Sequence, residues 1–288
     1  MQSSNPIFRR SEGFNGRGNS TMSSPATWST GAAGGYAHGG QDTYGDGYGG
    51  GYGQAPRVDQ GRMTIDSVVQ KTGITLGVVV LFAAATWVLT GEVRSNAALA
   101  SLYSLAMVGA LGGFVLAMVN SFKKAVSPAL VLTYAALEGV FIGAFSKALE
   151  ARFGDGLVTG AVLGTLAAVA GTLAAYKFFD IKVTPKFRMW VVGAMFGFVA
   201  VSLLNLVMSF FGADFGFNGF GTMGLISSVI GLGLGVLMLI LDFDFVERGI
   251  EAGLPERESW RAAFGLTVTI IWIYIELLRL LAILRGND

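Results

Sequence analysis

The chain has 288 residues, of which 52% are hydrophobic and only 14% are charged, and its formal net charge is +1. A soluble domain carries roughly 25% charged residues, so this composition predicts a membrane protein with several spans. The absence of cysteine and the single histidine exclude disulfides, thiolate metal sites, cysteine nucleophiles and histidine-based catalysis, and the near-zero net charge favours no nucleic-acid partner.

Residues 1–62 are dominated by Gly, Ser, Asn, Thr and evenly spaced Tyr. Such a segment buries too little apolar surface to offset chain entropy, so we predict a disordered tail. We expect it to be a solubilising segment; the alternative is that its tyrosines contact a partner. No apolar run of signal-peptide length occurs in it, so the first membrane helix is expected to direct insertion.

From residue 63 to residue 288 the sequence predicts one all-α membrane domain, a bundle of seven transmembrane helices. Residues 63–71 are interpreted as an amphipathic lead-in. Apolar runs follow, most of them near the ~20 residues that a spanning helix needs. Their predicted ranges are 74–90, 97–120, 128–149, 156–179, 189–211, 222–245 and 263–284. Small residues at Gly160/Gly164 and Gly231/Gly235 favour close helix packing, which we expect mainly within one chain; the oligomeric state stays open.

Lysine and arginine are distributed unequally between the connections. The connections on one side, together with the tail, hold most of them, whereas the other side holds only Arg94, Lys147, Arg152 and Arg285. The positive-inside rule therefore predicts a cytoplasmic N-terminus, an outside C-terminus and a cytoplasmic 245–262 connection. The 212–221 connection, which has no Lys or Arg, is expected outside.

Acidic residues within or at the end of apolar runs are the candidate site, because a carboxylate in hydrocarbon is costly and usually faces a bundle interior or a watery path. Asp242 and Asp244 close the sixth run. We interpret Asp244 as a solvated interfacial acid, and for Asp242 both that role and a pore-facing role remain open. Glu276 lies well inside the seventh run and is expected to face the interior. Arg279, three residues later, is its candidate ion-pair partner.

Glu138 is a third acid within an apolar run, and two roles remain open for it: capping a backbone defect in another helix, or lining a cation path. Several intramembrane acids without a nucleophile–base pair favour cation handling over covalent chemistry. Carboxylates bind hard cations such as Ca²⁺ through oxygen, so Asp242 and Glu276 are also candidate Ca²⁺ ligands. An intramembrane aspartyl protease remains formally open for the same two acids, although no second catalytic loop motif accompanies them.

The order and placement of these features resemble the Bax inhibitor family, also called transmembrane Bax inhibitor motif proteins, in its bacterial branch. The resemblance rests on seven spans, on the segment from Tyr134 to Gly139 with Glu138, on Asp-Phe-Asp-Phe-Val-Glu-Arg-Gly from Asp242 to Gly249, and on a seventh helix with a central acid. It covers residues 63–285 and leaves the tail outside.

The resemblance implies a pH-sensitive calcium leak in the bacterial inner membrane, without enzymatic activity or a bound cofactor, acting on Ca²⁺ and H⁺ in the lipid bilayer. In the family, an aspartate pair on the sixth and seventh helices shares protons and gates a central pore. By position Asp242 matches the first aspartate and Glu276 the second, with Glu138 and Asp244 as accessory acids. The sequence departs from the family in having Glu at the second position and a longer connection. The alternatives are a non-conducting regulator of a membrane protease or another membrane complex, and a proton-coupled transporter.

Overall fold

The computed structural model describes residues 61–123 and 125–286 of the chain, and its regular elements there are seven α-helices. All seven are long and apolar enough to cross a membrane, which confirms the predicted all-α, seven-span class. The predicted disordered tail lies outside the described residues as far as residue 60. The helices are α1 (Ile65–Leu89), α2 (Asn96–Phe122), α3 (Pro128–Phe153), α4 (Leu157–Phe178), α5 (Pro185–Phe210), α6 (Thr222–Glu251) and α7 (Glu258–Gly286).

The helix ends differ from the apolar runs for physical reasons. Thr64 caps α1 by accepting a hydrogen bond from the backbone N–H of Ser67 at 3.1 Å, so the predicted lead-in 63–71 is wrong as a separate element and forms mainly the first turns of α1. The predicted 245–262 connection is also too long. Because α6 continues to Glu251 and α7 begins at Glu258, only a short turn, residues 252–257, joins them. Charged residues end the apolar run without ending the helix.

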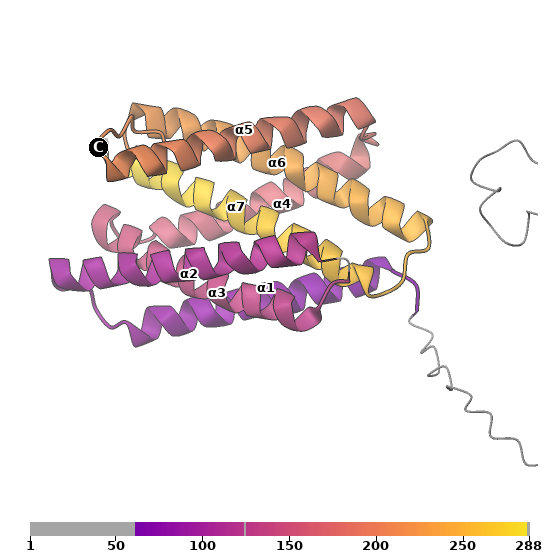
Figure 1. Cartoon of the computed structure of the whole chain (residues 1–288), viewed down its shortest axis with the longest axis horizontal. Coiled ribbons are helices and arrows are strands. Elements are labelled where there is room, and N and C mark those ends of the chain that lie inside the picture. The colour runs from indigo at the N-terminus through magenta and orange to yellow at the C-terminus, as the bar shows by residue number, and fades with distance from the viewer. Residues whose placement is uncertain (1–60, 124, 287–288) are drawn as a thin grey trace, which may run out of the picture. The chain divides into compact units, whose positions relative to one another are not determined.

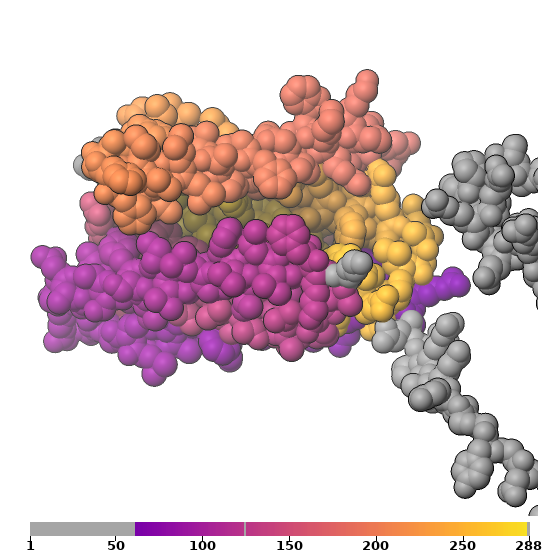
Figure 2. All heavy atoms as spheres, viewed as in Figure 1, coloured from indigo at the N-terminus to yellow at the C-terminus, as the bar shows by residue number. Residues whose placement is uncertain are grey.

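Helix α7 is the centre of the bundle. It packs against α1, α3, α4 and α6, and Figure 1 shows it running between the α5–α6 layer and the layer formed by α1, α2 and α3. Within the described part of the chain, the backbone of α2 comes close only to α3, and that of α5 only to α6, although the side chain of Phe198 on α5 also reaches Trp272 on α7. The space-filling view shows the result, a hollow between α2 and the α5–α6 layer with α7 in its floor (Figure 2). The helix that carries Glu276 therefore lies in the interior of the bundle.

Both glycine pairs singled out in the sequence pack against this central helix. A Cβ on Gly160 or Gly164 would lie 3.2 or 3.3 Å from the side chain of a leucine on α7. A Cβ on Gly231 or Gly235 would lie 2.8 Å from the side chain of another residue on α7. Small residues at these positions let α4 and α6 approach α7 closely, so their packing role lies within the chain.

The residues before α1 are fastened to the α6–α7 turn. The backbone N–H of Met63 donates to the carbonyl of Leu254, and the N–H of Glu256 donates to the carbonyl of Gly61, both at 2.7 Å. Lys71 forms an ion pair with the Glu256 carboxylate at 2.9 Å. The start of α1 and the α6–α7 turn therefore lie at the same end of the bundle, and residues 61 and 62, which we predicted to be in the tail, are part of this contact.

Candidate functional site

Asp242 lies on α6 toward the end that carries the α6–α7 turn. The hydroxyl of Thr269 on α7 donates a hydrogen bond to its Oδ2 at 2.5 Å, and Thr269 is itself buried. Gly265, one turn earlier on α7, leaves room beside the other oxygen, because a Cβ there would lie 3.5 Å from Oδ1. Among the described residues Asp242 forms no ion pair. Asp242 is thus a carboxylate within a spanning helix, and its hydrogen-bond partner is a neutral hydroxyl.

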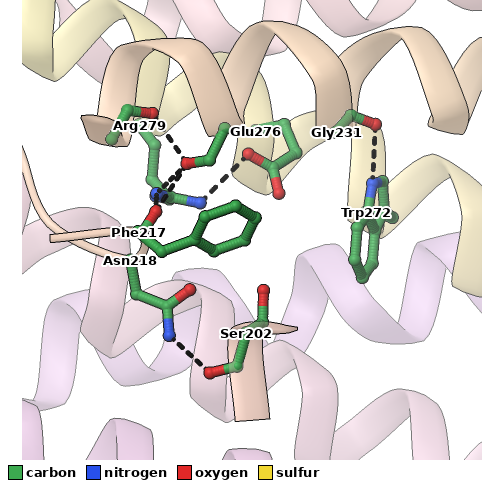
Figure 3. A network of polar contacts seen from close by, with 9 residues as sticks. Ser202, Phe217, Asn218, Gly231, Trp272, Glu276 and Arg279 are labelled. Carbon is green, nitrogen blue, oxygen red and sulfur yellow. Dashed lines mark hydrogen bonds and ion pairs between the residues drawn. The ribbon is translucent and has the colours of Figure 1, made fainter. Parts of the chain in front are cut away.

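Glu276 is buried, with only 4% of its surface exposed, and its environment differs from that of Asp242. Arg279, one turn later on α7, donates from Nη1 to Oε2 at 3.1 Å. Gly231 of α6 faces the carboxylate so closely that a Cβ would lie 2.8 Å from Oε1. Figure 3 shows this ion pair from close by, together with Gly231. The charge of Glu276 is thus compensated within the bundle.

The same arginine holds the α5–α6 loop (residues 211–221) against the bundle. Its Nη2 donates to the backbone carbonyl of Phe217 at 3.1 Å and lies 3.3 Å from the hydroxyl of Ser227, which also donates to that carbonyl at 2.5 Å. The side-chain amide of Asn218 donates to the backbone carbonyl of Ser202 on α5 at 2.8 Å. These contacts, drawn in part in Figure 3, fasten the loop to three helices.

The ring of Phe217 packs against Phe198 of α5. Its centroid lies 5.2 Å from that of Phe198, which in turn lies 5.5 Å from the ring of Trp272. The indole N–H of Trp272 donates to the carbonyl of Gly231 at 2.9 Å. We predicted this loop to lie outside because it lacks Lys and Arg, and Phe217, Asn218 and Trp272 were not among the predicted site residues. The loop closes the end of the bundle beside Glu276.

The structure does not bring Asp242 and Glu276 together, which corrects the expected proton-sharing pair. Thr269, the partner of Asp242, precedes Glu276 by two helical turns, about 10 Å along the axis. On α6, Gly231 faces Glu276, and Asp242 lies about 16 Å farther along that helix. One Ca²⁺ cannot bind both acids directly, since its oxygen ligands lie within about 2.6 Å. Within the described ranges, no group of three or more His, Asp or Glu side chains is placed to hold a metal ion.

Asp244 is not a solvated interfacial acid. It is 5% exposed, and it forms ion pairs with Arg188 of α5 at 2.7 Å and Arg248 of α6 at 2.9 Å. Arg248 also donates to the carbonyl of Val183, ahead of α5, at 2.6 Å. The prediction failed because the arginine on α5 cannot be placed beside Asp244 from the sequence of α6. This cluster ties α5 to α6, the only helix that the backbone of α5 approaches closely in the described structure.

Glu138 lies on α3 and faces α2. A Cβ on Gly113 of α2 would lie 2.7 Å from its Oε1, and Tyr134, one turn earlier on α3, is its polar neighbour. Among the described residues, no hydrogen bond from Glu138 to the backbone of another helix is seen, and none links it to Asp242 or Glu276. The contacts do not favour the role of capping a backbone defect.

Similarity to known proteins extends over nearly the whole chain. The profile of the family described as Bax inhibitor 1 like matches residues 5–286. The match begins well before residue 63, so it extends farther toward the N-terminus than the resemblance we drew. An uncharacterised protein of Chlamydia muridarum (strain MoPn / Nigg) is 26% identical over 198 residues, which cover 67% of this chain and 80% of that protein.

Proposed function

The chain belongs to the Bax inhibitor 1-like family of membrane proteins, and on that premise we propose that it is a pH-sensitive calcium leak in a bacterial inner membrane. One observation carries the proposal: Asp242, in a membrane-spanning helix, has a neutral hydroxyl as its hydrogen-bond partner. An uncompensated intramembrane carboxylate is costly and is typical of ion pathways. The relative from Chlamydia muridarum supports a bacterial setting.

In this proposal Asp242 is the proton-sensitive group. Its ionised carboxylate attracts a cation entering from the end of the bundle that carries the α6–α7 turn, and protonation removes that attraction. Glu276 is a second proton-sensitive group, whose negative charge is held by Arg279 while the α5–α6 loop is in place. Each acid has its own surroundings, because Thr269, the partner of Asp242, lies two helical turns from Glu276 on α7. Glu138 would be an accessory acid on the α2 side.

The closed end of the path is proposed to be the α5–α6 loop. Phe217 packs there on Phe198, and its carbonyl is bound by Arg279. Conduction requires the α5–α6 loop to move away from the bundle. This movement breaks the contact of Arg279 with the Phe217 carbonyl and exposes Glu276. An aspartyl protease is not favoured, because two catalytic acids must share a proton and these carboxylates are too far apart to do so.

We further propose that the end with the α6–α7 turn is cytoplasmic, which gives an N-terminus inside and a C-terminus outside. The support is the concentration of Lys and Arg in the connections at that end. The contacts of residues 61–63 with the α6–α7 turn fit this arrangement, because they require the start of α1 and this turn to lie on one side.

The test is calcium flux through the purified full-length chain in liposomes loaded with a Ca²⁺ indicator. The proposal expects Ca²⁺ entry above that of protein-free liposomes, with a rate that changes with pH. Absence of flux at every pH would reject conduction and favour the regulator of a membrane protease or other membrane complex. Uptake that saturates with an organic substrate and requires a proton gradient would instead indicate a transporter.

A further inference from the structure

A pocket of about 700 Å³ lies at the mouth of the hollow beside α2. Its walls come from the last turn of α2, from Phe245 of α6 and from the start of α7, where Phe264 and Gly265 contribute. Since α2 packs only on α3 in the described structure, no neighbouring helix closes the pocket on that side. Figure 2 shows the hollow continuing from this region between α2 and the α5–α6 layer. The pocket therefore combines an aromatic wall with a lateral opening along the membrane-spanning helices.

Asn120 places an unpaired side-chain amide in the wall of this pocket. It lines the pocket and is only 6% exposed, yet neither its amide nitrogen nor its amide oxygen has a hydrogen-bond partner in the described structure. Buried polar groups are nearly always paired, because an unpaired one loses its water without replacement. The amide offers two donors and an acceptor, so its natural complement is a ligand with ester or hydroxyl oxygens.

The charge at the rim is positive. Lys123 lines the pocket and forms no ion pair among the described residues. Arg261 also lines it, but its guanidinium is already paired with Glu258 at 3.3 Å. Lys123 is therefore the charge available to a ligand, and it attracts an anion. The pocket thus suits a ligand with three parts: an anion for Lys123, ester oxygens for Asn120 and an apolar body for the hollow. An anionic phospholipid has all three.

We propose that this pocket binds one anionic phospholipid, with its phosphate against Lys123, its glycerol ester oxygens at Asn120 and an acyl chain in the hollow beside α2. This inference does not rest on the proposed ion conduction. The lipid head group would lie near the α7 surface at Gly265, which faces Asp242. A lipid is chosen over a soluble phosphate compound because the hollow lies among helices that can span the membrane.

The test is native mass spectrometry of the purified full-length chain, titrated with phosphatidylglycerol and, separately, with phosphatidylcholine of the same acyl chains. We expect one phosphatidylglycerol to be retained at lower concentration than phosphatidylcholine. Lys123→Gln should weaken the retention about five-fold, the effect of one basic residue at a membrane surface. Asn120→Leu, which keeps the branched shape and the number of heavy atoms of the side chain, should weaken it about five- to tenfold through lost hydrogen bonds. Lys177→Gln, an exposed lysine at the same end but outside the pocket, is the matched control and should retain the lipid.

Three results would overturn the proposal. The first is equal retention of the two lipids by the unmodified chain. The second is retention unchanged by Lys123→Gln and by Asn120→Leu, with both variants shown to be helical by circular dichroism. The third is displacement of bound phosphatidylglycerol by sn-glycerol 3-phosphate, which would identify a site for soluble phosphate esters in place of lipid.

Discussion

The hydroxyl of Thr269 donates a 2.5 Å hydrogen bond to the carboxylate of Asp242, joining α7 to α6 where a second acid was expected. Threonine keeps Asp242 hydrogen-bonded without compensating its charge. The acid of α7, Glu276, lies two turns farther along and has its own cation, Arg279. The bundle therefore has two separate acidic positions, one beside a neutral hydroxyl and one inside an ion pair.

The α5–α6 loop is predicted to limit the leak. Phe217→Ala removes the ring that packs on Phe198, so the loop should leave the bundle more often and Ca²⁺ flux in liposomes should rise several-fold. Phe215→Ala is the matched control, since Phe215 belongs to the same loop and is 45% exposed. Equal flux in both variants and the unmodified chain would show that the loop does not close the path.

Gly231 is predicted to be irreplaceable for steric reasons. Gly231→Ala would place a Cβ 2.8 Å from Oε1 of Glu276, which Arg279 holds, and 3.0 Å from the Phe198 ring. Overpacking of this kind typically costs about 1–3 kcal/mol, measurable as a lower melting temperature in detergent. Gly233→Ala, on the same helix with open space around it, should leave the melting temperature unchanged or raise it slightly. A similar effect of both variants would contradict the close contact.

The buried carboxylate of Asp244 is predicted to hold α5 on α6. Asp244→Asn leaves Arg188 and Arg248 without their shared counter-charge. Because both arginines are about half exposed, we expect a loss of about 1–3 kcal/mol, less than the 3–5 kcal/mol for a fully buried pair. The check is thermal unfolding, with the exposed Glu251→Gln as control. Stability equal to that of the control would mean that the ion pairs contribute nothing.

The proposed topology predicts the labelling of single cysteines introduced into this cysteine-free chain. Cysteines at Ser29 and Ala252 should resist an impermeant thiol reagent in intact cells, whereas one at Ala213, in the α5–α6 loop, should react. Ala252 is preferred to Gly253 because Gly253 has a φ of 63°, which a side chain would strain. Labelling at Ser29 or Ala252 from outside would refute the orientation.

Hydropathy predicted the seven spans well because each helix carries a long apolar run. It located the ends poorly at α6 and α7, since Glu247 and Arg248 end the apolar run while continuing the helix. A hydrophobicity pattern marks where a helix leaves the membrane, and capping residues mark where it ends.

The partners of the acids were less predictable. Arg279 was found because it lies one turn from Glu276 on the same helix, and such pairs can be recognised by spacing. Thr269 was missed because a hydroxyl in an apolar run has many uses, and its place opposite Asp242 depends on how α6 and α7 are aligned. Phe217 binds Arg279 through its backbone carbonyl, and a backbone group leaves no signature in the sequence.

The most direct test of the account is the pH dependence of Ca²⁺ flux in liposomes for Asp242→Asn, Glu276→Gln and the double variant. Asparagine mimics the protonated acid, so Asp242→Asn should lose most of the pH response across roughly pH 5–8 and keep only the part that Glu276 contributes. Glu276→Gln should keep the rest of the pH response, and the double variant should combine the two changes additively, as sites more than about 10 Å apart do. A full pH response in Asp242→Asn would contradict the account.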